Sequence, residues 1–540
     1  MSSVTTRAPG TFLSVLQPGA SARPSRRASD DTLHDLALDQ VSARLASATR
    51  TVDLAALFAC PLDDPDDVRY RQAVFADLRL EPVVHAVDGF EELVRTVLLH
   101  ENAASQAHYA QERDLWHLHA ADAYVQAVTA LATTLPAALE EAGATSDALA
   151  GLARHVRAHV ASAAFEELRD RVARLVEGVA SVRVDILVRG AKVTVARYDG
   201  ETDLEQEVLE TFARFRQDVP AGDPRPVGSD LGLDHVQAAI LGEVAHLYPE
   251  LFADLAAFAR DVPDVVEPVL RRAAGELLFY TAYLALLRPL EQAGLVTCLP
   301  DVTATKALSV RDTYDLALAR VRVAEHKPVV TNDLELHDAE RILVVSGPNQ
   351  GGKTTAARTF GQLHHLASLG CPVPGRDAQL FLADQVLTQF EREESLDSLE
   401  GRLGTDLARM HRLLDAATDR SVVVLNEVFS STTLDDARFL TRTVLERLIA
   451  LDVLAVCVTF IDAMSRLGPQ TVSVVARVDP DDPTRRTLRL ARRPADGRAY
   501  ALALAAKYGL TDEHLRERLA PCGHAGGPDD DRAEGTGAAS

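Results

Sequence analysis

One octapeptide constrains the fold of this chain more than any other feature. It reads Gly-Pro-Asn-Gln-Gly-Gly-Lys-Thr at positions 347–354. Residues 341–346 before it have the pattern of a buried strand, and residues 355–369 after it have the pattern of a helix. Strand, glycine-rich loop and helix in this order are typical of a phosphate-binding loop (P-loop), in which backbone N–H groups and a helix N-terminus face the phosphates. We therefore predict a nucleotide site inside an α/β domain.

The motif also assigns individual roles. We expect Lys353 to lie against the β- and γ-phosphates of ATP and to be catalytic, and the Thr354 hydroxyl to bind Mg²⁺. The other ATP-binding positions are expected to be Gly347, Pro348, Asn349, Gln350, Gly351, Gly352 and Thr355.

Two further β-rich segments end in polar residues. Residues 421–425 form an apolar run that ends in Asn426-Glu427, and in P-loop ATPases such a strand lies beside the P-loop strand. We expect Glu427 to be the general base and Asn426 to accept a hydrogen bond from Mg²⁺-bound water. Because an amide supplies no charge, slow hydrolysis is expected. A third run, 453–459, ends before Phe460, which the sequence alone assigns to packing.

Composition excludes several classes of protein. The net charge of −23 argues against a generally basic surface for nucleic acid, although a local basic strip is compatible with it. No apolar run reaches the roughly 18 residues of a membrane helix, and the longest, 276–287, is expected to be a buried helix. The five cysteines are far apart, which disfavours a zinc site or a disulfide framework and fits a reducing cytoplasm.

Residue patterns divide the chain into four regions. We expect a flexible tail at 1–33, a mostly helical domain at 34–330, an α/β domain at 331–520 and a disordered tail at 521–540. A long amphipathic helical stretch runs from Ser146 to Val179, and two β-branched runs around a glycine at 182–198 predict a hairpin. The hairpin favours a projecting arm with a β tip, and a β insertion in a compact helical domain is the alternative.

The α/β half resembles the ATPase domain of the MutS DNA mismatch-repair family. That family's P-loop variant also has Pro-Asn after the first glycine, as Gly347-Pro-Asn does here, and residues 328–336 are similar to its first strand. Leu425-Asn-Glu427, Thr432, Thr433, Asp436 and Thr459 fall at family spacings, and residues 497–510 are similar to its dimerisation segment. Residues 35–40 and 68–78 resemble the family's helical core and lever, less specifically.

The resemblance implies an ABC-type P-loop ATPase domain that follows helical core, lever and clamp arms. This chain departs from the pattern at several places. It begins directly in the helical core, so we expect neither the mismatch-reading domain nor, after residue 520, a nuclease-like extension. Val329 stands where an aromatic residue often stacks on adenine, Phe460 replaces a histidine near the γ-phosphate, and Gly401 replaces a serine of the signature segment at 395–406.

By resemblance we expect a homodimer, paired through its ATPase domains, that clamps mismatched, branched or otherwise structured DNA and is switched by ATP and Mg²⁺. It would act in the cytoplasm, with nucleoid association possible, and without a membrane. Four basic residues of the hairpin are candidate DNA contacts, with a merely solvated basic face as the alternative: Arg183, Arg189, Lys192 and Arg197. The alternative function is an ATP-driven clamp that acts on ribosomes or on a protein partner.

Overall fold

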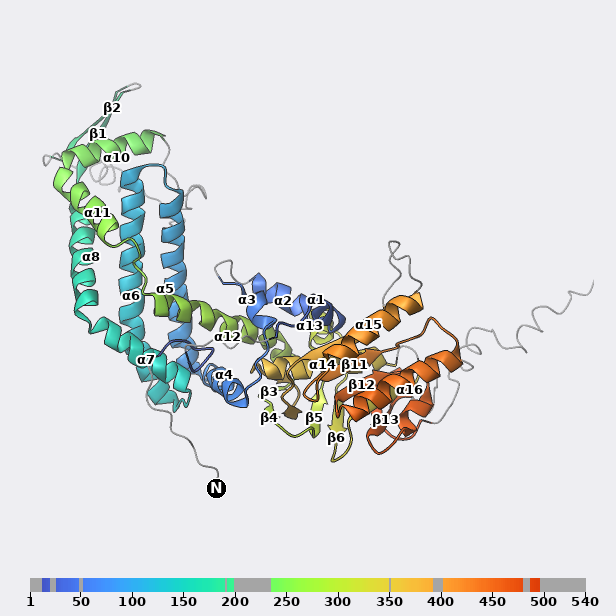
Figure 1. The fold of residues 1–540 in the computed structure, drawn as a ribbon. Coiled ribbons are helices and arrows are strands. Elements are labelled where there is room, and N and C mark those ends of the chain that lie inside the picture. Colours follow the sequence, from blue (N-terminus) through green and yellow to red (C-terminus); the bar gives the residue numbers. More distant parts are fainter. Residues whose placement is uncertain are drawn as a thin grey trace, which may run out of the picture.

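A long helical arm projects from an α/β part (Figure 1). The computed structural model describes residues 12–19, 26–47, 52–189, 192–198, 235–348, 351–391, 402–478 and 486–495. The α/β part contains the 347–354 loop, and the arm ends in a two-stranded hairpin far from it. The hairpin prediction is confirmed, and its place at the tip of an arm excludes the compact alternative.

Long helices that lie side by side build the arm. Its elements are α5 (Glu81–Gln106), α6 (Ala110–Ala142), α8 (Ala163–Ser181), α10 (His235–Leu247), α11 (Pro249–Asp261), β1 (Val184–Arg189) and β2 (Lys192–Arg197). The chain leaves α6 at Gly143, whose φ of 62° is left-handed and therefore favours glycine. Strands β1 and β2 pair antiparallel over all six residues, and β2 packs against α10.

The predicted helical stretch from Ser146 to Val179 is broken in the structure. Helix α7 (Asp147–Val160) ends before Ser162, and α8 begins after it. The Ser162 hydroxyl accepts a hydrogen bond from the Phe165 N–H at 3.2 Å, which caps the new helix. The prediction of one continuous helix was wrong because the apolar period continues across a residue that can start a helix of its own.

Helix α12 (Pro268–Gln292) runs from the arm into the α/β part and confirms the predicted buried helix. Tyr280 and Tyr283 are fully buried on it, and their hydroxyls donate to the Val15 and Pro372 carbonyls at 2.7 and 2.8 Å. Within the described parts of the chain, no helix combines the length and apolar character needed to cross a membrane.

The N-terminal segment corrects one prediction. Val15 and Leu16 are buried against the core, and the Glu276 carboxylate accepts hydrogen bonds from the Ser14 hydroxyl at 2.8 Å and the Val15 N–H at 2.7 Å. Residues 26–33 are likewise described and lead into the first helix. The flexible-tail prediction for 1–33 was therefore wrong for 12–19 and 26–33, because a short apolar segment gives no sign of its distant partner on α12.

Several short helices surround the junction between the arm and the α/β part. They are α1 (Asp30–Asp35), α2 (Asp39–Ala46), α3 (Leu54–Phe58), α4 (Pro65–Asp77) and α13 (Leu316–Ala324). Arg71 of α4 is buried there and donates to the Leu16 and Leu369 carbonyls at 3.1 and 3.2 Å. The N-terminal segment, α4 and the end of the helix that follows the 347–354 loop are thus tied together.

The main sheet has the strand order β10-β11-β12-β7-β13-β14. Its strands are β7 (Ile342–Ser346), β10 (Val386–Phe390), β11 (Val422–Asn426), β12 (Leu454–Val458), β13 (Thr471–Val478) and β14 (Arg486–Arg492), and only β14 runs antiparallel to its neighbour. The predicted strands at 341–346, 421–425 and 453–459 are confirmed.

Side chains alternate between the two faces of the sheet, as a period of two requires. Leu343 and Val345 belong to the larger hydrophobic core, which includes helix α14 (Lys353–Ser368), whereas Ile342 and Val344 belong to a second core with α16 (Leu434–Ala450). Helix α15 (Arg402–Ala416) contributes to this second core. Both faces are covered, which explains why these strands are almost purely apolar.

A second sheet moves the domain boundary. Its order is β4-β9-β5-β6, with β4 (Asp301–Thr303), β5 (Leu308–Thr313), β6 (Asn332–Leu336) and β9 (Asp377–Phe381), and the short pair β3 (Thr297–Cys298) and β8 (Val373–Pro374) lies beside it. Strands before residue 330 thus pair with strands after it. The α/β part therefore begins near residue 297, not 331. The sequence did not indicate this boundary, because strands this short show too few alternating residues to be recognised.

Candidate functional site

The 347–354 loop connects β7 to α14, as predicted. Gly347 and Gly352 have φ angles of 123° and 90°, and a Cβ on Gly347 would lie 3.1 Å from the Ala476 backbone. A Cβ on Gly351 would lie 2.9 Å from the Pro348 carbonyl oxygen. A side chain at either position would meet Ala476 of β13 or the loop's own carbonyl, so the glycines let the loop turn tightly and pack closely against β13. Asn349 and Gln350 lie outside the described residues.

Lys353 begins α14 and is 5% exposed. Its ammonium group donates to the Gly347 carbonyl at 3.1 Å and lies 3.3 Å from the Glu427 carboxylate. Thr354 and Thr355 follow in the first turn of α14 and are half-buried. The fold therefore brings together the two residues predicted to be catalytic, 74 positions apart, at the N-terminus of one helix.

The strand order corrects the expected route to this contact. The strand that carries Asn426 and Glu427, β11, was expected beside β7, but β12 lies between them. Glu427 reaches Lys353 across that intervening strand, and its N–H donates to the Val458 carbonyl of β12 at 3.0 Å. A local pattern identifies a strand but not its neighbour, because hydrogen bonding between strands is decided by the whole sheet.

Glu427 itself adopts an unusual backbone conformation. Its φ of 51° lies in the left-handed region, as does the φ of 60° at Phe429 two residues later. Such conformations in residues other than glycine cost on the order of 1 kcal/mol or more and persist only where the surroundings impose them. Phe429 is buried and anchors this turn, on which the Glu427 carboxylate lies 3.3 Å from the Lys353 ammonium group.

Asn426 fits the predicted contact with a hydrated cation. It is 7% exposed, and its Oδ1 atom is buried with no hydrogen-bond partner. A buried acceptor without a donor is costly, and Mg²⁺-bound water would supply that donor. In the described residues no three His, Cys, Asp or Glu side chains form a metal site.

A cavity of about 110 Å³ adjoins the loop on the side of β6 and β14. Gly352 and Thr355 line it together with Val329, Asn332 and Leu488. The Asn332 amide connects the walls, since it donates to the Leu488 carbonyl at 3.1 Å and accepts from the Leu490 N–H at 2.7 Å. This cavity lies where a base joined to loop-bound phosphates could enter.

Two residues that position α14 had not been predicted. Gln362 is fully buried, and its amide donates to the Leu36 carbonyl at 2.8 Å and to Asp315 at 2.9 Å. Asp315 also lies 2.9 Å from Arg358 of α14, as an ion pair not aligned for a hydrogen bond. The sequence contains no signal for these contacts, because each joins residues far apart in the chain.

Phe460 corrects a smaller prediction. It follows β12 and is 53% exposed, so the assignment to packing was wrong. Thr459, in contrast, is buried, and its hydroxyl accepts from the Ile461 N–H at 3.1 Å. An apolar run that ends in an aromatic residue is typical of a buried segment. Here the chain reaches the surface of the protein just after the strand ends.

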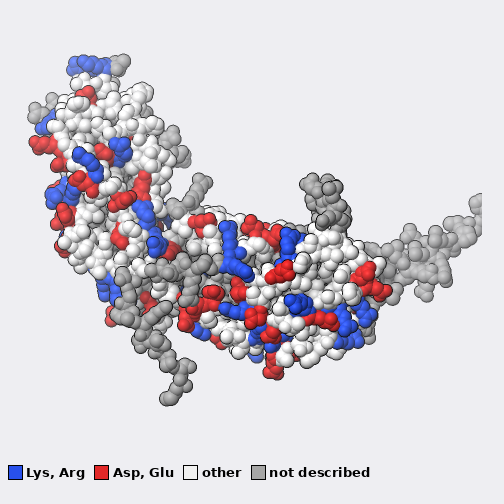
Figure 2. Space-filling model, viewed as in Figure 1, with Lys and Arg blue, Asp and Glu red and all other residues white. Residues whose placement is uncertain are grey.

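The hairpin divides the four candidate DNA contacts into two pairs. The Arg183 guanidinium donates to the Ala180 carbonyl at 2.7 Å, and Arg197 donates to the Leu247 carbonyl at 3.0 Å and lies 4.9 Å from the Tyr248 ring centre. Arg197 thus ties the hairpin to the end of α10, whereas the Arg183 guanidinium binds the end of α8. Arg189 and Lys192 lie opposite each other at its free end and are exposed, where Figure 2 shows a basic tip. All four residues are exposed, but only Arg189 and Lys192 lie at the free end of the hairpin, so they remain the candidates for a DNA contact at the tip.

Helix α14 gives a prediction about acid stability. Burial lowers the pKa of both His364 and His365 to about 4, below the roughly 6.5 of an unfolded chain. Between these values the unfolded chain binds more protons, so stability decreases as the pH falls from 6.5 to 4, by at most about 2.7 kcal/mol per pH unit for two histidines. We expect urea unfolding at pH 7 and 5 to show a smaller pH effect in the variant His364→Gln/His365→Gln.

The measurement must compare the variant with the wild type, because another buried group also titrates in this pH range. Burial raises the pKa of Glu91 to about 7, and this carboxyl has the opposite effect on stability over part of the same range. Glu91 is present in both proteins, so it cancels in the difference. An equal pH dependence in both would contradict the assignment of the acid sensitivity to α14.

Other predicted segments lie outside the described residues. These are the signature segment at 395–401 with Gly401, the dimerisation segment at 497–510, residues 203–234 of the predicted helical domain and the tail at 521–540. Thr433 and Asp436, which fall at family spacings, are described: the Thr433 hydroxyl caps α16 and lies 2.8 Å from the Asp436 carboxylate.

Comparisons with known proteins cover part of the chain. A family model described as MutS domain V matches residues 343–508. The chain is 30% identical over 254 residues to "Endonuclease MutS2" of Thermus thermophilus, which covers 44% of this chain and 33% of that protein. It is 30% identical over 139 residues to "DNA mismatch repair protein MutS" of Chlorobaculum tepidum, which covers 26% and 16%. The matches thus span a third or less of these relatives' length.

Proposed function

Because this chain belongs to the MutS family, we propose that it is an ATPase that uses ATP and Mg²⁺ to switch a DNA-binding clamp. The contact between Lys353 and Glu427 at 3.3 Å, beside the glycine-rich loop, is the observation that carries the proposal. The DNA bound would be mismatched, branched or otherwise structured. No feature of the described residues favours a ribosome or a protein partner in its place.

In the proposed site each residue has one task. Backbone N–H groups of the 347–354 loop and the N-terminus of α14 would bind the phosphates, and the Lys353 ammonium would neutralise charge on the γ-phosphate. Thr354 and Asn426 would hold Mg²⁺, directly and through water, and Mg²⁺ neutralises phosphate charge when bound. Glu427 would accept the proton of the attacking water. The base would enter the cavity beside Val329.

The ion pair suggests how binding of ATP prepares hydrolysis. Lys353 is buried beside Glu427. A bound triphosphate carries more negative charge than the single Glu427 carboxylate and would compete with it for the Lys353 ammonium group. Glu427 would then lose its partner and be free to accept a proton. ATP binding would thus create the active form of the base.

We also propose a homodimer through the α/β part. Leu434 and Phe439 of α16 are 60% and 69% exposed, and Phe460 is 53% exposed. Large apolar side chains so exposed on one part of a protein are typical of protein interfaces. With two subunits, ATP bound between them would be coupled to the arms by a free energy typically of about 1–3 kcal/mol.

The arm supplies the proposed contact with DNA. Arg189 and Lys192 at its tip are exposed, and a contact with phosphates would position DNA without reading its sequence. We expect Arg189→Ala/Lys192→Ala to weaken binding to matched, mismatched and four-way-junction DNA, and to reduce the slope of log K against log salt by about 1.8 for two lost phosphate contacts. Fluorescence anisotropy at several salt concentrations measures both effects.

A matched control removes the same charge from positions away from the hairpin tip. Arg154 of α7 and Arg174 of α8 are also exposed, and Arg154→Ala/Arg174→Ala should leave the salt slope unchanged. ATPase activity measured with and without the same DNAs tests the whole proposal. No salt-sensitive binding to any of the three DNAs, together with ATPase activity that ignores DNA, would exclude the clamp.

A further inference from the structure

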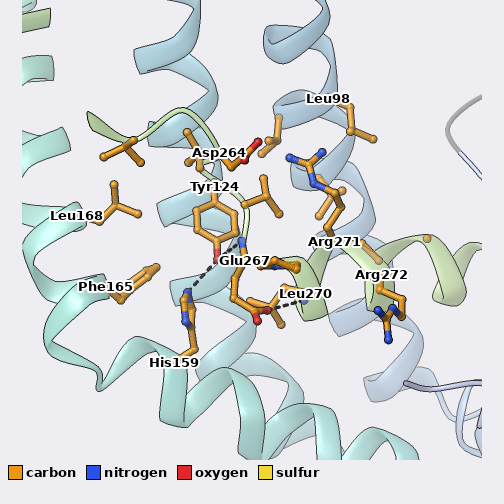
Figure 3. A pocket seen from close by; sticks show the side chains of 18 of the residues that line it. Leu98, Tyr124, His159, Phe165, Leu168, Asp264, Glu267, Leu270, Arg271 and Arg272 are labelled. Carbon is orange, nitrogen blue, oxygen red and sulfur yellow. Dashed lines mark hydrogen bonds between the residues drawn. The ribbon is translucent and has the colours of Figure 1, made fainter. Parts of the chain in front are cut away.

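A large pocket lies at the elbow where the arm meets α12, far from the 347–354 loop. Its volume is about 980 Å³, and its walls come from α5, α6, α8, α12 and the segment 262–267 that joins α11 to α12 (Figure 3). Close-packed interiors leave few voids larger than one water molecule, and small-molecule sites measure roughly 300–1,000 Å³. This space is therefore the size of a ligand site and not of a packing defect.

The walls are mainly apolar. Leu98 projects from α5 on one side of the pocket, while Phe165 and Leu168 project from α8 on the other. Val265 and Leu270, near the start of α12, are almost fully buried and complete the lining. A ligand would therefore gain most of its affinity from burial of apolar surface.

One polar group faces this apolar space. The Tyr124 hydroxyl lies 2.9 Å from His159 Nε2 and accepts from the Glu267 N–H at 3.3 Å. Tyr124 is 3% exposed, so its ring is fixed and its hydroxyl has a defined direction. The Glu267 carboxylate is occupied elsewhere, since it accepts from the Leu270 N–H at 2.7 Å and lies 3.4 Å from His155. With the hydroxyl donating to His159 and accepting from Glu267, one acceptor lone pair of Tyr124 is left for a donor group of a ligand.

The charged residues at the rim largely neutralise one another. Arg171 lies 2.9 Å from the Asp261 carboxylate, and Arg271 forms two hydrogen bonds with Glu101 at 2.9 and 2.6 Å. Arg272 is exposed and lies in the field of Glu276. Three arginines (Arg171, Arg271 and Arg272) and four carboxylates (Glu167, Asp261, Asp264 and Glu267) line the pocket, so opposite charges nearly balance and no strong charge would select an ion.

We propose that this pocket binds a small neutral molecule with a mostly apolar body and one hydrogen-bond donor group directed at the Tyr124 hydroxyl. The site is separate from the proposed nucleotide site and does not depend on it. Its walls belong both to the arm and to the helix that enters the α/β part, so a bound molecule would contact both at once.

The test uses the full chain and N-phenyl-1-naphthylamine, a neutral apolar fluorophore with one N–H group, in the absence of nucleotide and DNA. We expect saturable binding with one molecule per chain. Leu98→Trp places a larger ring in space that a ligand would occupy and should weaken binding at least about tenfold. The matched control Leu99→Trp, at a neighbouring position that is 53% exposed and does not line the pocket, should bind as the wild type does.

Two more variants keep the result decisive. Leu168→Trp places a larger ring in the pocket from the opposite wall. It replaces Leu98→Trp as the test if circular dichroism shows that Leu98→Trp does not fold. Tyr124→Phe keeps the shape and removes the hydroxyl, and binding should weaken about fivefold for one lost hydrogen bond. Absence of saturable binding to the wild type, or equal affinity of Leu98→Trp, Leu168→Trp and Leu99→Trp, would overturn the proposal. Because the binding test contains no nucleotide, its outcome does not depend on whether the protein is an active ATPase.

Discussion

Lys353→Ala is expected to abolish ATP binding. Lys353 is buried at the N-terminus of α14, and truncating one partner of a buried charge pair costs about 2–5 kcal/mol. That cost corresponds to an affinity roughly 30- to 5,000-fold lower. Equilibrium binding of a fluorescent ATP analogue measures the effect.

The interpretation requires that the variant is folded. Removal of Lys353 also leaves Glu427 without its ion pair, so the thermal midpoint should be measured in parallel. Lys327→Ala is the matched control, because Lys327 is an exposed lysine that pairs with Glu325 at 2.9 Å on the surface. Retained ATP affinity in a folded Lys353→Ala protein would refute the assignment of the nucleotide site.

Glu427→Gln should stop turnover while leaving ATP bound. A glutamine keeps the shape and can still accept a hydrogen bond, but it cannot take a proton, and loss of a general base typically lowers the rate by about 10²–10⁴-fold. ATP affinity should be equal or higher, because Lys353 no longer has a carboxylate partner that competes with the phosphates. Single-turnover hydrolysis and the ratio of bound ATP to ADP distinguish the two effects.

Its control lies on the same part of the protein. Glu446 is an exposed carboxylate on α16 that pairs with Arg442 at 2.7 Å, and Glu446→Gln should not change turnover. Unchanged hydrolysis in Glu427→Gln would assign the base to another residue. A loss of ATP binding in Glu427→Gln would instead show that the carboxylate supports the structure of the loop.

The arm shows where prediction from sequence succeeds and where it stops. The hairpin was predictable because alternating β-branched residues around Gly190 are a local signal. The roles of its basic residues were not. Arg183 and Arg197 look like Arg189 in the sequence, but their guanidinium groups donate to the carbonyls of Ala180 and Leu247. All of them are exposed, and which guanidinium also meets a backbone carbonyl depends on how the hairpin joins α8 and α10.

The α/β part shows the same division. The glycines, Lys353 and Thr354 were identified because a phosphate-binding loop is built from consecutive residues whose backbone conformation follows from their chemistry. The strand order was not, and neither were the burial of Val15 on α12, the contacts of Gln362 and the exposure of Phe460.

By itself the sequence determined the hairpin, three strands of the main sheet, the glycine-rich loop and the identity of the residues at its edge, since each depends on neighbours within a few positions. Only the tertiary structure decided that Glu427 reaches Lys353 across β12, which arginines stay at the tip, and that a pocket of about 980 Å³ opens at the elbow. The physical reason is that contacts between distant segments depend on the packing of the whole chain, which no short pattern records.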